Sequence, residues 1–594
     1  MKHLAHLNKY FYKYRWRMIP GVLFVIISNY FGVIPAQVIR LAFDLVTENI
    51  GLYRLYNGFD RQEIVNDLFA YSLFLFGALV LVLALIRGLF LFLMRQTLIL
   101  TSRHIEYDLK NEIYEHYQKL SSAFYRRNNT GDLMNRVTED VNRVRSYLGP
   151  AIMYSINTVV LSIMVIASMI SVNPQLALYA LLPIPFLSAL LLYVNRIINR
   201  RSERIQRQLS TLSALVQETF SGIRVVKTYN REQDRMDAFE KESHTYKDET
   251  LGLVRVEAVF FPLILLLVGL STIITVYVGG LEVSRGTISG GNIAEFIVYV
   301  NQLTFPAMSL AWVTSLIQRA AASQKRINEF LQTEPEIRPG PLQPDGLKGH
   351  IRFEGVSFTY PDTGIKALKN IHFQVEPGQI VAIIGRTGSG KSTITQLLMR
   401  MYDADQGTIT VDGTDIRQFD TAAYRQHIGY VPQEVFLFSD TIANNIAFGL
   451  DEATPEQIED AARRAVVYHN IIGFEDGFQT HIGERGITLS GGQKQRLSIA
   501  RALIKDPTIL IFDDCLSAVD TSTEEQILAQ LRDTIADKSC VFIAHRISTI
   551  KNADHILVLN EGEIIEQGTH EKLLELKGEY FELHEKQLLE EEEA

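Results

Sequence analysis

The sequence predicts an α-helical membrane domain of six long spans with cytosolic helical extensions, followed by an α/β domain built around a phosphate-binding loop. Three observations lead to this fold class. Six apolar stretches in the first half are each long enough to cross a bilayer. A proline-rich segment without apolar periodicity separates the two halves. The second half opens with a strand, a glycine-rich loop and a helix in succession.

The composition of the 594 residues fits this division. The chain is 47% hydrophobic and 21% charged, and the long apolar runs lie in the first half. Its length exceeds one compact domain and fits two or three. The formal net charge of −9 argues against a general nucleic-acid binder. Two cysteines, Cys515 and Cys540, form neither a disulfide framework nor a zinc site, which favours a reducing cytosol for the second half.

Each predicted span exceeds the length of about 20 residues that a helix needs to cross a bilayer. The second span, FAYSLFLFGALVLVLALIRGLFLFLM, has a single charge, at Arg87, so a buried helix of a soluble protein is a much weaker interpretation. The basic N-terminal residues lead into a span that is too long for a signal-peptide core, and no signal peptide is expected. The six spans lie at about 18–46, 69–97, 150–172, 175–199, 256–280 and 288–317.

The distribution of Lys and Arg predicts the orientation of the spans. The N-terminal segment and the stretches 103–145 and 200–255 are basic, whereas the loops 171–174 and 279–287 are short and carry little charge. By the positive-inside rule, the chain is expected to be a multi-pass protein of the cytoplasmic (inner) membrane, with both termini and the second domain in the cytosol. The two basic stretches are helical in pattern, so spans two to five are expected to continue as helices into the cytosol.

Polar residues inside the spans predict contacts within the helix bundle or with a water-filled cavity. Interhelical hydrogen bonds are the simpler interpretation for any single one. The last span differs, since YVNQLTFPAMSLAW (299–312) mixes amides, hydroxyls, aromatic rings, Met and Pro306. This composition suits an adaptable lining for an amphipathic ligand. The polar span residues are Asn29, Gln37, Arg87, Asn195, Asn301 and Gln302.

The segment QIVAIIGRTGSGKSTITQLLMRMY predicts a nucleotide site. Residues 385–392 match the pattern G-x-x-x-x-G-K-[ST] between a strand and a helix. Gly388 and Gly390 let backbone N–H groups close around phosphate oxygens, and the helix N-terminus adds partial positive charge. Lys391 is expected to reach the outer phosphates and Ser392 to ligate magnesium. The expected ligands are therefore the phosphates of a nucleotide and Mg²⁺, and the family resemblance described below implies that this nucleotide is ATP.

Two further motifs complete the predicted site. The apolar strand ILIFDD (509–514) ends in two carboxylates, and Asp513 is expected to hold the water shell of the magnesium ion. Before it, LSGGQ (489–493) leads into the helix QKQRLSIARAL. Ser490 and two glycines at a helix start form another anion site, although a simple helix cap would also explain this short motif. Its position between the phosphate loop and the paired acids makes the nucleotide interpretation specific.

With these motifs in this order, the whole chain resembles a half-transporter of the multidrug-type ABC exporter family. Members have six spans followed by one α/β P-loop ABC nucleotide-binding domain. The resemblance implies ATP hydrolysis coupled to the export of hydrophobic or amphipathic compounds, and a second half-transporter as partner. The domains are then 1–325 (membrane domain), 326–350 (linker), 351–585 (nucleotide-binding domain) and 586–594, an acidic tail whose end LLEEEEA (588–594) is expected to be solvated.

The resemblance also implies roles for single residues. Tyr360 in FTYPD matches the aromatic ring that stacks on adenine, and Gln433 in YVPQ matches the glutamine that contacts magnesium and senses the membrane domain. His545 in IAHR matches the switch histidine at the γ-phosphate. The residues implied to bind nucleotide are Tyr360, Gly385, Thr387, Gly388, Ser389, Gly390, Lys391, Ser392, Thr393, Ser490, Gly491, Gly492, Gln493 and Asp520. Those implied to hold magnesium are Ser392, Gln433 and Asp513, and those implied in catalysis are Asp514, His545 and Gln433.

Four segments resemble the parts of the family that transmit motion. GERG (483–486) matches the segment that touches the helical loops, and SAVD (517–520) matches the crossing loop, with Val where Leu is more usual. FYRRNNTGDLMNRV (124–137) and ETFSGIRVVKTYNRE (218–232) resemble the two coupling helices. Because the signature motif of one subunit closes over the nucleotide of the other in this family, a dimer is expected.

Asp514 departs from the family pattern. The residue after the magnesium aspartate is commonly Glu, the general base, and a carboxylate drawn back by about 1 Å can cost on the order of a hundredfold in rate. A poor base beside an intact signature motif resembles one half of the heterodimeric exporters, whose partner carries Glu and a degraded signature. Three alternatives stay open: a backbone shift that lets Asp514 work normally, a homodimeric exporter or lipid flippase with two equivalent sites, and an ABC-fold regulator or ATP-gated channel. The cargo, whether drug, lipid or peptide, also stays open.

Overall fold

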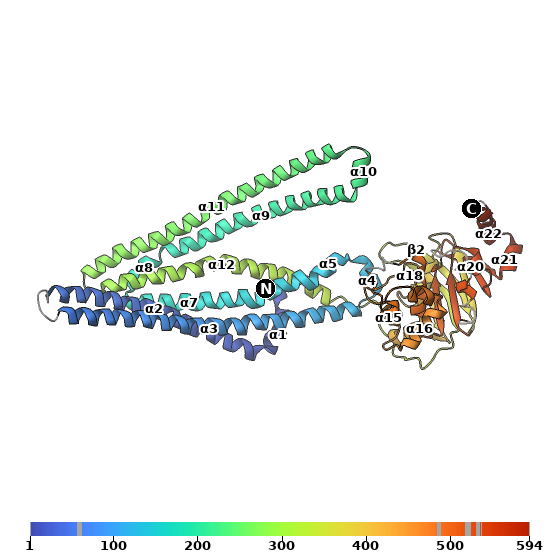
Figure 1. The fold of residues 1–594 in the computed structure, drawn as a ribbon, viewed down its shortest axis with the longest axis horizontal. Helices are drawn as coiled ribbons and strands as arrows, with labels where there is room; N and C mark the ends of the chain where they lie inside the picture. The colour runs from blue at the N-terminus through green and yellow to red at the C-terminus, as the bar shows by residue number, and fades with distance from the viewer. Residues whose placement is uncertain are drawn as a thin grey trace. The chain divides into compact units, whose positions relative to one another are not determined.

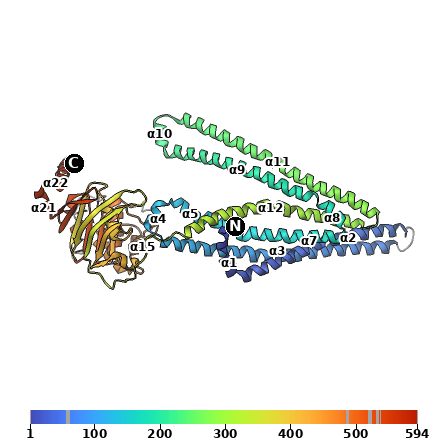
Figure 2. The ribbon, with the colours of Figure 1, turned by 180° about the vertical axis from the view of Figure 1, so that it is seen from behind.

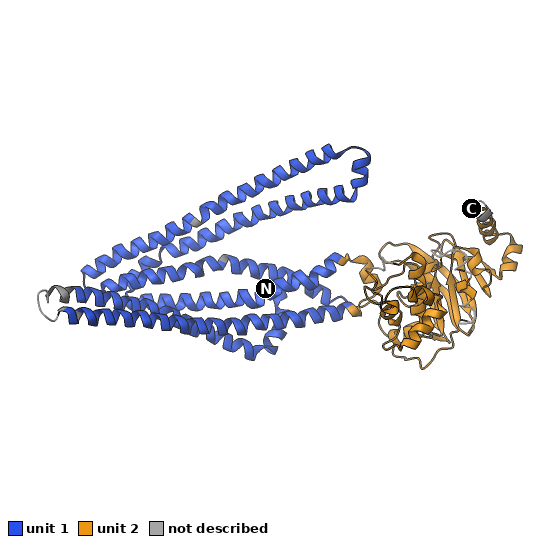
Figure 3. Ribbon diagram, viewed as in Figure 1, with its two compact units in different colours: residues 1–117, 131–333 blue, residues 118–130, 334–594 orange. Residues whose placement is uncertain are grey.

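The computed structural model describes residues 2–55, 62–483, 489–516, 524, 526–529, 531, 535 and 537–592. These fall into two compact units, coloured separately in Figure 3. Unit 1 comprises Met1–Tyr117 and Gly131–Thr333, and unit 2 comprises Gln118–Thr130 and Glu334–Ala594. The short segment 118–130 therefore leaves the helical unit and packs with the C-terminal unit.

Unit 1 is entirely helical in the part that the structure describes (Figure 1). Six helical stretches are long and apolar enough to cross a membrane, which confirms the predicted number of spans: Arg15–Ile50, Asn66–Lys119, Thr130–Val172, Pro174–Ser221, Glu232–Ser284 and Gly290–Leu331. The long helices are α2 (Arg15–Leu55), α3 (Gln62–Lys119), α7 (Ile152–Val172), α9 (Pro183–Ser221), α11 (Glu232–Ser284) and α12 (Gly290–Leu331). The short ones are α1 (Asn8–Lys13), α5 (Thr130–Asn135), α6 (Val141–Ser146), α8 (Pro174–Leu181) and α10 (Ile223–Thr228).

The helices run well beyond the apolar spans, as expected from the pattern of the basic stretches. α3 continues through IEYDLKNEIYEHYQK to Lys119, and α9 continues past the apolar run to Ser221. α9 and α11 lie side by side and are joined by α10 at their polar ends (Figures 1 and 2). Farther along this hairpin, the side-chain amide of Gln208 donates to the backbone oxygen of Glu242 at 3.1 Å. Polar contacts therefore hold the two helices together where apolar packing ends.

Polar residues in the spans join neighbouring helices. Asn29 Nδ2 donates to Asn157 Oδ1 at 2.9 Å, and Gln302 Nε2 donates to the backbone oxygen of Gly32 at 2.9 Å. The hydroxyls of Thr158 and Ser309 lie 2.8 Å apart in the interior. For Asn29 and Gln302, the interhelical interpretation is therefore the one that the structure supports.

The last span has two kinds of surface. The side chains of Tyr299, Val300, Leu303 and Ala307 are buried in the bundle, whereas Phe305 is 51% exposed in the single chain. Met308 and Trp312 share this exposed character. The exposed set includes large polarizable side chains, as an adaptable ligand-facing surface would require.

Unit 2 contains two sheets. The first has the strand order β2–β1–β4–β5 and is antiparallel; the second has the order β10–β9–β3–β8–β7–β6 and is parallel except for the β9–β10 pair. The strands of the first sheet are β1 (Ile351–Thr359), β2 (Lys366–Val375), β4 (Gln406–Val411) and β5 (Thr414–Asp415). Those of the second are β3 (Ile380–Gly385), β6 (Ile428–Val431), β7 (Ile509–Asp513), β8 (Ser539–Ile543), β9 (His555–Asn560) and β10 (Glu563–Gly568).

The second sheet brings the predicted motifs to one edge. All five residues of β7 are buried, which explains why ILIFD reads as a continuous apolar run rather than an alternating one. β8 lies between β3 and β7 and pairs in parallel with both, so β3 and β7 end at the same edge. The crevice beyond the carboxyl ends of parallel strands is where such sheets bind ligands. The phosphate loop and the paired acids are therefore neighbours although they are far apart in the sequence.

The helices of unit 2 cover the sheets and connect the strands (Figure 1). Large apolar cores form on either side of the parallel sheet, one of which includes Ala123 from the segment 118–130. The helices are α4 (Ser122–Arg127), α13 (Lys391–Leu398), α14 (Thr421–Gln426), α15 (Ile442–Ala447), α16 (Pro455–Arg464), α17 (Tyr468–Ile472), α18 (Gly491–Leu503), α20 (Ile547–Ile550), α21 (His570–Leu576) and α22 (Glu579–Glu592).

Candidate nucleotide site

The loop between β3 and α13 requires glycine for two different reasons. Gly388 has φ +84° and Gly390 has φ +101°, a backbone conformation that favours glycine. At Gly390 a Cβ would also lie 2.4 Å from the backbone oxygen of Ala367, whereas at Gly388 it would meet open space. At Gly385 a Cβ would lie 2.0 Å from the backbone oxygen of Leu559 on β9. The loop is thus held tightly at its ends and open in its middle, beside the exposed Thr387.

The polar groups of this loop suit a phosphate. Ser389 is 4% exposed, and its hydroxyl has no hydrogen-bond partner among the residues that the structure describes. Lys391 Nζ donates to the backbone oxygens of Gly385 at 2.9 Å and Arg386 at 3.0 Å. Burial lowers the pKa of Lys391, and the charges of Asp514 and Asp513 oppose that shift. Among the described residues, Lys391 is a buried cation whose hydrogen bonds go to neutral carbonyls. This cation and the Ser389 hydroxyl at a helix start fit the phosphates of a nucleotide.

The side chains of Ser392 and Asp513 are in direct contact, as two residues that share a magnesium ion should be. Ser392 Oγ donates to Asp513 Oδ1 at 2.9 Å. Thr395 Oγ1 and Tyr430 OH donate to the other carboxylate oxygen at 3.3 and 3.4 Å. Burial raises the pKa of Asp513, and these hydroxyl groups oppose the shift. Hydroxyl and carboxylate oxygens are ligands that Mg²⁺ prefers, with substrate phosphates and water supplying the others. Thr395 and Tyr430 were not among the predicted site residues.

The three residues with predicted catalytic roles converge at one carboxylate. Asp514 Oδ2 accepts a hydrogen bond from Gln433 Nε2 at 3.0 Å and lies 3.9 Å from His545 Nε2. The backbone N–H of Asp514 donates to Ile543 on β8 at 2.9 Å. Its φ is +46°, in the left-handed region where Asp and Asn are enriched among residues with side chains. The short acid is therefore compatible with this backbone, and its carboxylate faces the glutamine and the histidine.

Tyr360 lies between the phosphate helix and the segment 118–130. Its hydroxyl is 3.0 Å from Thr393 Oγ1 and donates to Gln396 Oε1 at 3.1 Å, both on α13. The guanidinium of Arg126, on α4, lies 4.7 Å from the centre of the Tyr360 ring. Arg126 also lies 3.2 Å from Asp362 and donates to the hydroxyl of Tyr402 at 3.3 Å. The family resemblance predicts a coupling helix at 124–137, which includes this arginine, but sequence reasoning did not single the arginine out, because it has no local signature.

The contact of Arg126 leads to a prediction about coupling. A cation over an aromatic ring contributes about 0.5–1 kcal/mol at exposed sites. Arg126→Ala should therefore change ATP affinity by less than about fivefold. The stimulation of ATPase activity by transported compounds should fall more strongly, because the substitution removes a direct contact between Tyr360 and the segment expected to form a coupling helix. Steady-state ATPase with and without a stimulating amphipathic compound measures this.

Arg127 provides the matched control. It follows on the same helix and pairs with Glu336 at 2.8 Å, and it has no ring contact among the described residues. Arg127→Ala should leave the stimulation near the wild-type level. Equal losses for the two variants would mean that α4 needs only its positive charge, not the contact with Tyr360.

The signature motif begins helix α18 with a complete capping box. Ser490 Oγ accepts from the backbone N–H of Gln493 at 3.3 Å, and Gln493 Oε1 accepts from the backbone N–H of Ser490 at 2.9 Å. Gly491 and Gly492 form the first turn, so no side chain covers the start of the helix there. This geometry offers N–H donors to an anion approaching the helix end. Residues 484–486 of GERG and the whole of SAVD, including Asp520, lie outside the described residues.

The last helix touches both sides of the site. Gln587 Nε2 donates to the backbone oxygen of His545 at 2.6 Å, and its side-chain oxygen accepts from the backbone N–H of Ile547 at 2.8 Å. Glu579, at the start of α22, accepts from Arg386 Nε of the phosphate loop at 2.7 Å. α22 therefore braces the loop that carries His545 and the loop that binds phosphate. Sequence reasoning did not single out these residues, because an acidic C-terminal helix has no motif.

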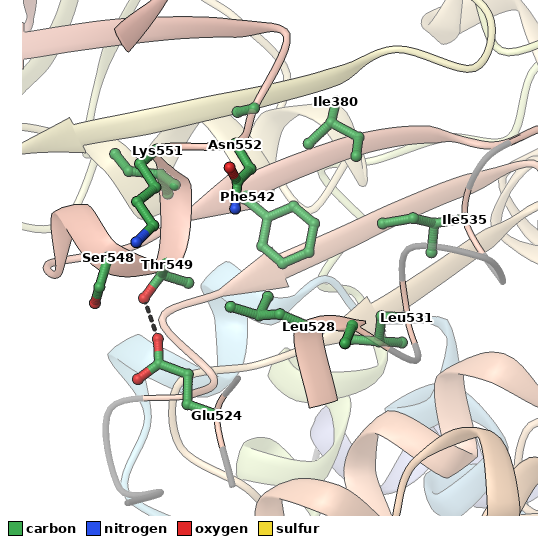
Figure 4. A pocket seen from close by; sticks show the side chains of 13 residues that line it. Ile380, Glu524, Leu528, Leu531, Ile535, Phe542, Ser548, Thr549, Lys551 and Asn552 are labelled. Carbon is green, nitrogen blue, oxygen red and sulfur yellow. Dashed lines mark hydrogen bonds between the residues drawn. The ribbon is translucent and has the colours of Figure 1, made fainter. Parts of the chain in front are cut away.

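Unit 2 also holds a cavity of about 300 Å³ away from the phosphate loop (Figure 4). Its walls are largely apolar, including Ile380, Leu531 and Phe542. Glu524 lies at its rim, hydrogen-bonded to the Thr549 hydroxyl and to Arg546 Nη1 at 3.1 Å. No residue of the segment 385–393 lines it, so this cavity is separate from the nucleotide site.

The comparisons with known proteins agree with this architecture. Residues 21–307 match the family described as "ABC transporter transmembrane region", and residues 368–517 match the family described as "ABC transporter". A solved structure described as a bacterial Atm1-family ABC exporter with ATP bound superposes with a TM-score of 0.77, at 27% identity, covering 96% of this chain and 98% of that one.

Curated relatives match over nearly the whole chain. The multidrug resistance-like ATP-binding protein MdlA of Escherichia coli (strain K12) is 32% identical over 99% of this chain and 97% of its own length. An ATP-dependent lipid A-core flippase of Pseudomonas fluorescens (strain Pf0-1) is 36% identical over 85% of this chain and 84% of its own. The chain therefore belongs to the ABC transporter family, as an exporter half-transporter whose membrane domain is fused to a cytosolic domain that binds ATP and Mg²⁺ and couples ATP hydrolysis to transport.

Proposed function

We propose that this chain is one subunit of a heterodimeric exporter that moves hydrophobic or amphipathic compounds out of the cytosol across the cytoplasmic membrane. ATP supplies the phosphoryl bond whose hydrolysis drives the cycle. Lys391 and the phosphate loop hold the nucleotide of this chain's own site, and Ser392 and Asp513 orient its magnesium ion. Residues 490–493 close over the nucleotide that the partner holds.

The observation that carries the heterodimeric part is the pairing of a short acid with an intact signature motif. Asp514 is one methylene shorter than the usual Glu, and its carboxylate bonds to Gln433 in its own domain. The capping box at Ser490 is complete. A subunit built this way holds ATP poorly placed for attack by water, while it equips the partner's site for hydrolysis. Its own site then acts as a long-lived clamp.

The side chains of the last span support an amphipathic cargo. Tyr154 packs edge-on against Trp312 and more loosely against Phe305, both of which are substantially exposed in the single chain. Flexible and aromatic side chains can repack around ligands of different shape. A relative that is described as a multidrug resistance-like protein, matched over 99% of this chain, favours the same class of cargo.

A second candidate is a lipid flippase with two equivalent sites. The lipid A-core flippases of two Pseudomonas fluorescens strains, 36% and 35% identical over 85% of this chain, favour it. In that case Asp514 acts as an ordinary base, and this chain works as a homodimer. The ATPase activity of the chain purified without a partner separates the two candidates.

Uphill transport tests the exporter function itself. In inside-out membrane vesicles, ATP should drive the accumulation of a fluorescent lipophilic dye above its equilibrium level, and a non-hydrolysable ATP analogue should not. The reason is that nucleotide binding alone can shift the conformation once, whereas net pumping needs repeated hydrolysis. Dye movement that stops at equilibrium with either nucleotide would identify an ATP-gated channel or regulator instead.

A further inference from the structure

A cavity of about 680 Å³ opens between α9 and α11, within unit 1. The two helices run side by side there, as Figures 1 and 2 show. The lining changes from apolar residues on the span side to charged residues on the side of α10. The apolar lining consists of Val194, Val256, Val259, Phe260 and Leu263.

Three arginines line the charged end: Arg201, Arg204 and Arg255. Within the described ranges, none of them makes a hydrogen bond or an ion pair. Other arginines of the α9–α11 hairpin are paired with acids. Arg207 pairs with Glu203 at 3.6 Å, and Arg235 pairs with Glu218 at 3.6 Å. The cavity therefore collects guanidinium groups whose charge the protein leaves uncompensated.

The acids at the same cavity do not cancel this charge. Asp248 lies 3.1 Å from His244 Nδ1 and 4.0 Å from Lys247 Nζ, so cationic or donor groups of its own helix already engage it. Glu249 is then the one carboxylate of the lining left to oppose three guanidinium groups. The excess of positive charge among the lining residues therefore favours an anion at the end of the cavity that the arginines line.

Gly252 makes room for one of the arginines. A Cβ at this position would lie 2.4 Å from Arg201 Nη1. The guanidinium of Arg201, carried by α9, therefore lies directly against the backbone of α11. Glycine at this position therefore leaves the space that the guanidinium of Arg201 occupies at the cavity wall.

The arginines lie at the level of a membrane surface. The apolar runs end near residue 199 on α9 and begin near residue 256 on α11, so Arg201 and Arg255 flank both spans. The ATP-binding domain follows the last span and is cytosolic, and successive spans alternate in direction, so the α9–α11 connection is also cytosolic. Phosphates of the cytosolic leaflet lie at this level and attract basic residues.

We infer that this cavity binds a phospholipid of the cytosolic leaflet. Arg201 and Arg255 contact its phosphate, and the acyl chains lie along the apolar lining between Val256 and Leu263. Guanidinium groups present several donors to a phosphate, which suits them to this role. The inference concerns a lipid held between α9 and α11 and does not depend on the identity of the cargo.

Native mass spectrometry of the purified full-length transporter tests this inference. With added phosphatidylglycerol, the wild type should retain lipid adducts, and Arg201→Ala/Arg255→Ala should weaken their apparent Kd by about tenfold or more, since each basic residue near a membrane surface contributes about 1 kcal/mol. Arg207→Ala, on the same helix but outside the cavity lining, is the matched control and should bind like the wild type. Arg201→Lys/Arg255→Lys, which keeps the charge but not the forked donors, should bind lipid more strongly than the alanine variant and more weakly than the wild type.

Two further ligands test which part of the phospholipid the cavity recognises. Diacylglycerol, which lacks the phosphate, should give no arginine-dependent adducts, and inorganic phosphate should not displace phosphatidylglycerol. Equal lipid binding by the wild type and Arg201→Ala/Arg255→Ala would overturn the inference. Equal loss in Arg207→Ala would show a diffuse charge effect, and full displacement by inorganic phosphate would show a free-phosphate site; each of these results would also overturn it.

Discussion

Lys391→Ala should weaken ATP binding at this chain's own phosphate loop by roughly tenfold to a hundredfold. The substitution removes a buried charge that faces the phosphates, and a hydrogen bond to a charged group contributes about 1.5–3 kcal/mol. The fold should survive, because in the part of the chain that the structure describes Lys391 Nζ donates only to the backbone oxygens of Gly385 and Arg386 in its own loop. Titration of the purified transporter with a fluorescent ATP analogue measures the loss.

Ser490→Ala is the control for this first prediction. Ser490 caps helix α18 and belongs to the motif proposed to close over the partner's nucleotide. Its substitution should leave ATP affinity at this chain's own loop within about twofold while it impairs hydrolysis of ATP held by the partner. A large loss of affinity at the loop of the Ser490→Ala chain would contradict the division of labour between the two motifs.

The second prediction concerns the short acid. In the proposed heterodimer, Asp514→Asn should lower steady-state ATPase only modestly, because the site built on Lys391 and Asp514 would already split ATP rarely. Replacing the catalytic Glu of the proposed partner with Gln should nearly abolish activity, by on the order of a hundredfold or more, since that site would carry the turnover. Near-complete loss with Asp514→Asn would favour two equivalent sites instead.

Asp514→Glu sharpens this second prediction. If only the length of the acid limits the site, the longer side chain should raise ATPase activity. The positive φ at this position, +46°, favours Asp over longer side chains, so a rise also requires the backbone to tolerate Glu. The ATPase activity of Asp514→Asn is therefore the main test. The activity of Asp514→Glu shows whether the backbone at this position accommodates the longer acid.

Local sequence patterns predicted most of the fold. Six spans were predictable because a bilayer imposes a minimum length of apolar helix, and the structure has six such helices in the part it describes. The phosphate loop was predictable because backbone geometry restricts it to glycine at Gly388 and Gly390. The meeting of the loop with Asp513 also followed, because parallel strands deliver their ends to one edge of the sheet.

Contacts between distant segments could not be predicted in this way. The contact of Arg126 with Tyr360 exists only because residues 118–130 fold onto the C-terminal unit, and no periodicity encodes that placement. The hydroxyl groups of Thr395, on helix α13, and Tyr430, on strand β6, both donate to the carboxylate of Asp513. Each of these residues is common in ordinary helices or strands, so its role depends on the assembled fold.

The C-terminal helix illustrates the same limit. The run of glutamates at its end gave no sign that Gln587 holds the backbone next to His545. Glutamine forms hydrogen bonds wherever a backbone group is within reach, and its sequence context does not say which group that will be. The bracing of the two loops by α22 became evident only from the folded arrangement.

The most direct test of the central claim is to identify which subunit traps nucleotide during turnover. The assembled transporter is incubated with Mg²⁺, vanadate and a photoreactive 8-azido-ATP, irradiated, and separated into its chains. Vanadate traps the product of hydrolysis, and the photoreactive adenine labels the chain beside it, which at this chain's own site is expected to be near Tyr360. In the proposed heterodimer, trapped label should accumulate on the partner, and this chain should be labelled without need of vanadate, as a site that retains intact ATP. Vanadate-dependent label on this chain, equal to or greater than that on the partner, would contradict the claim that its own site is a clamp.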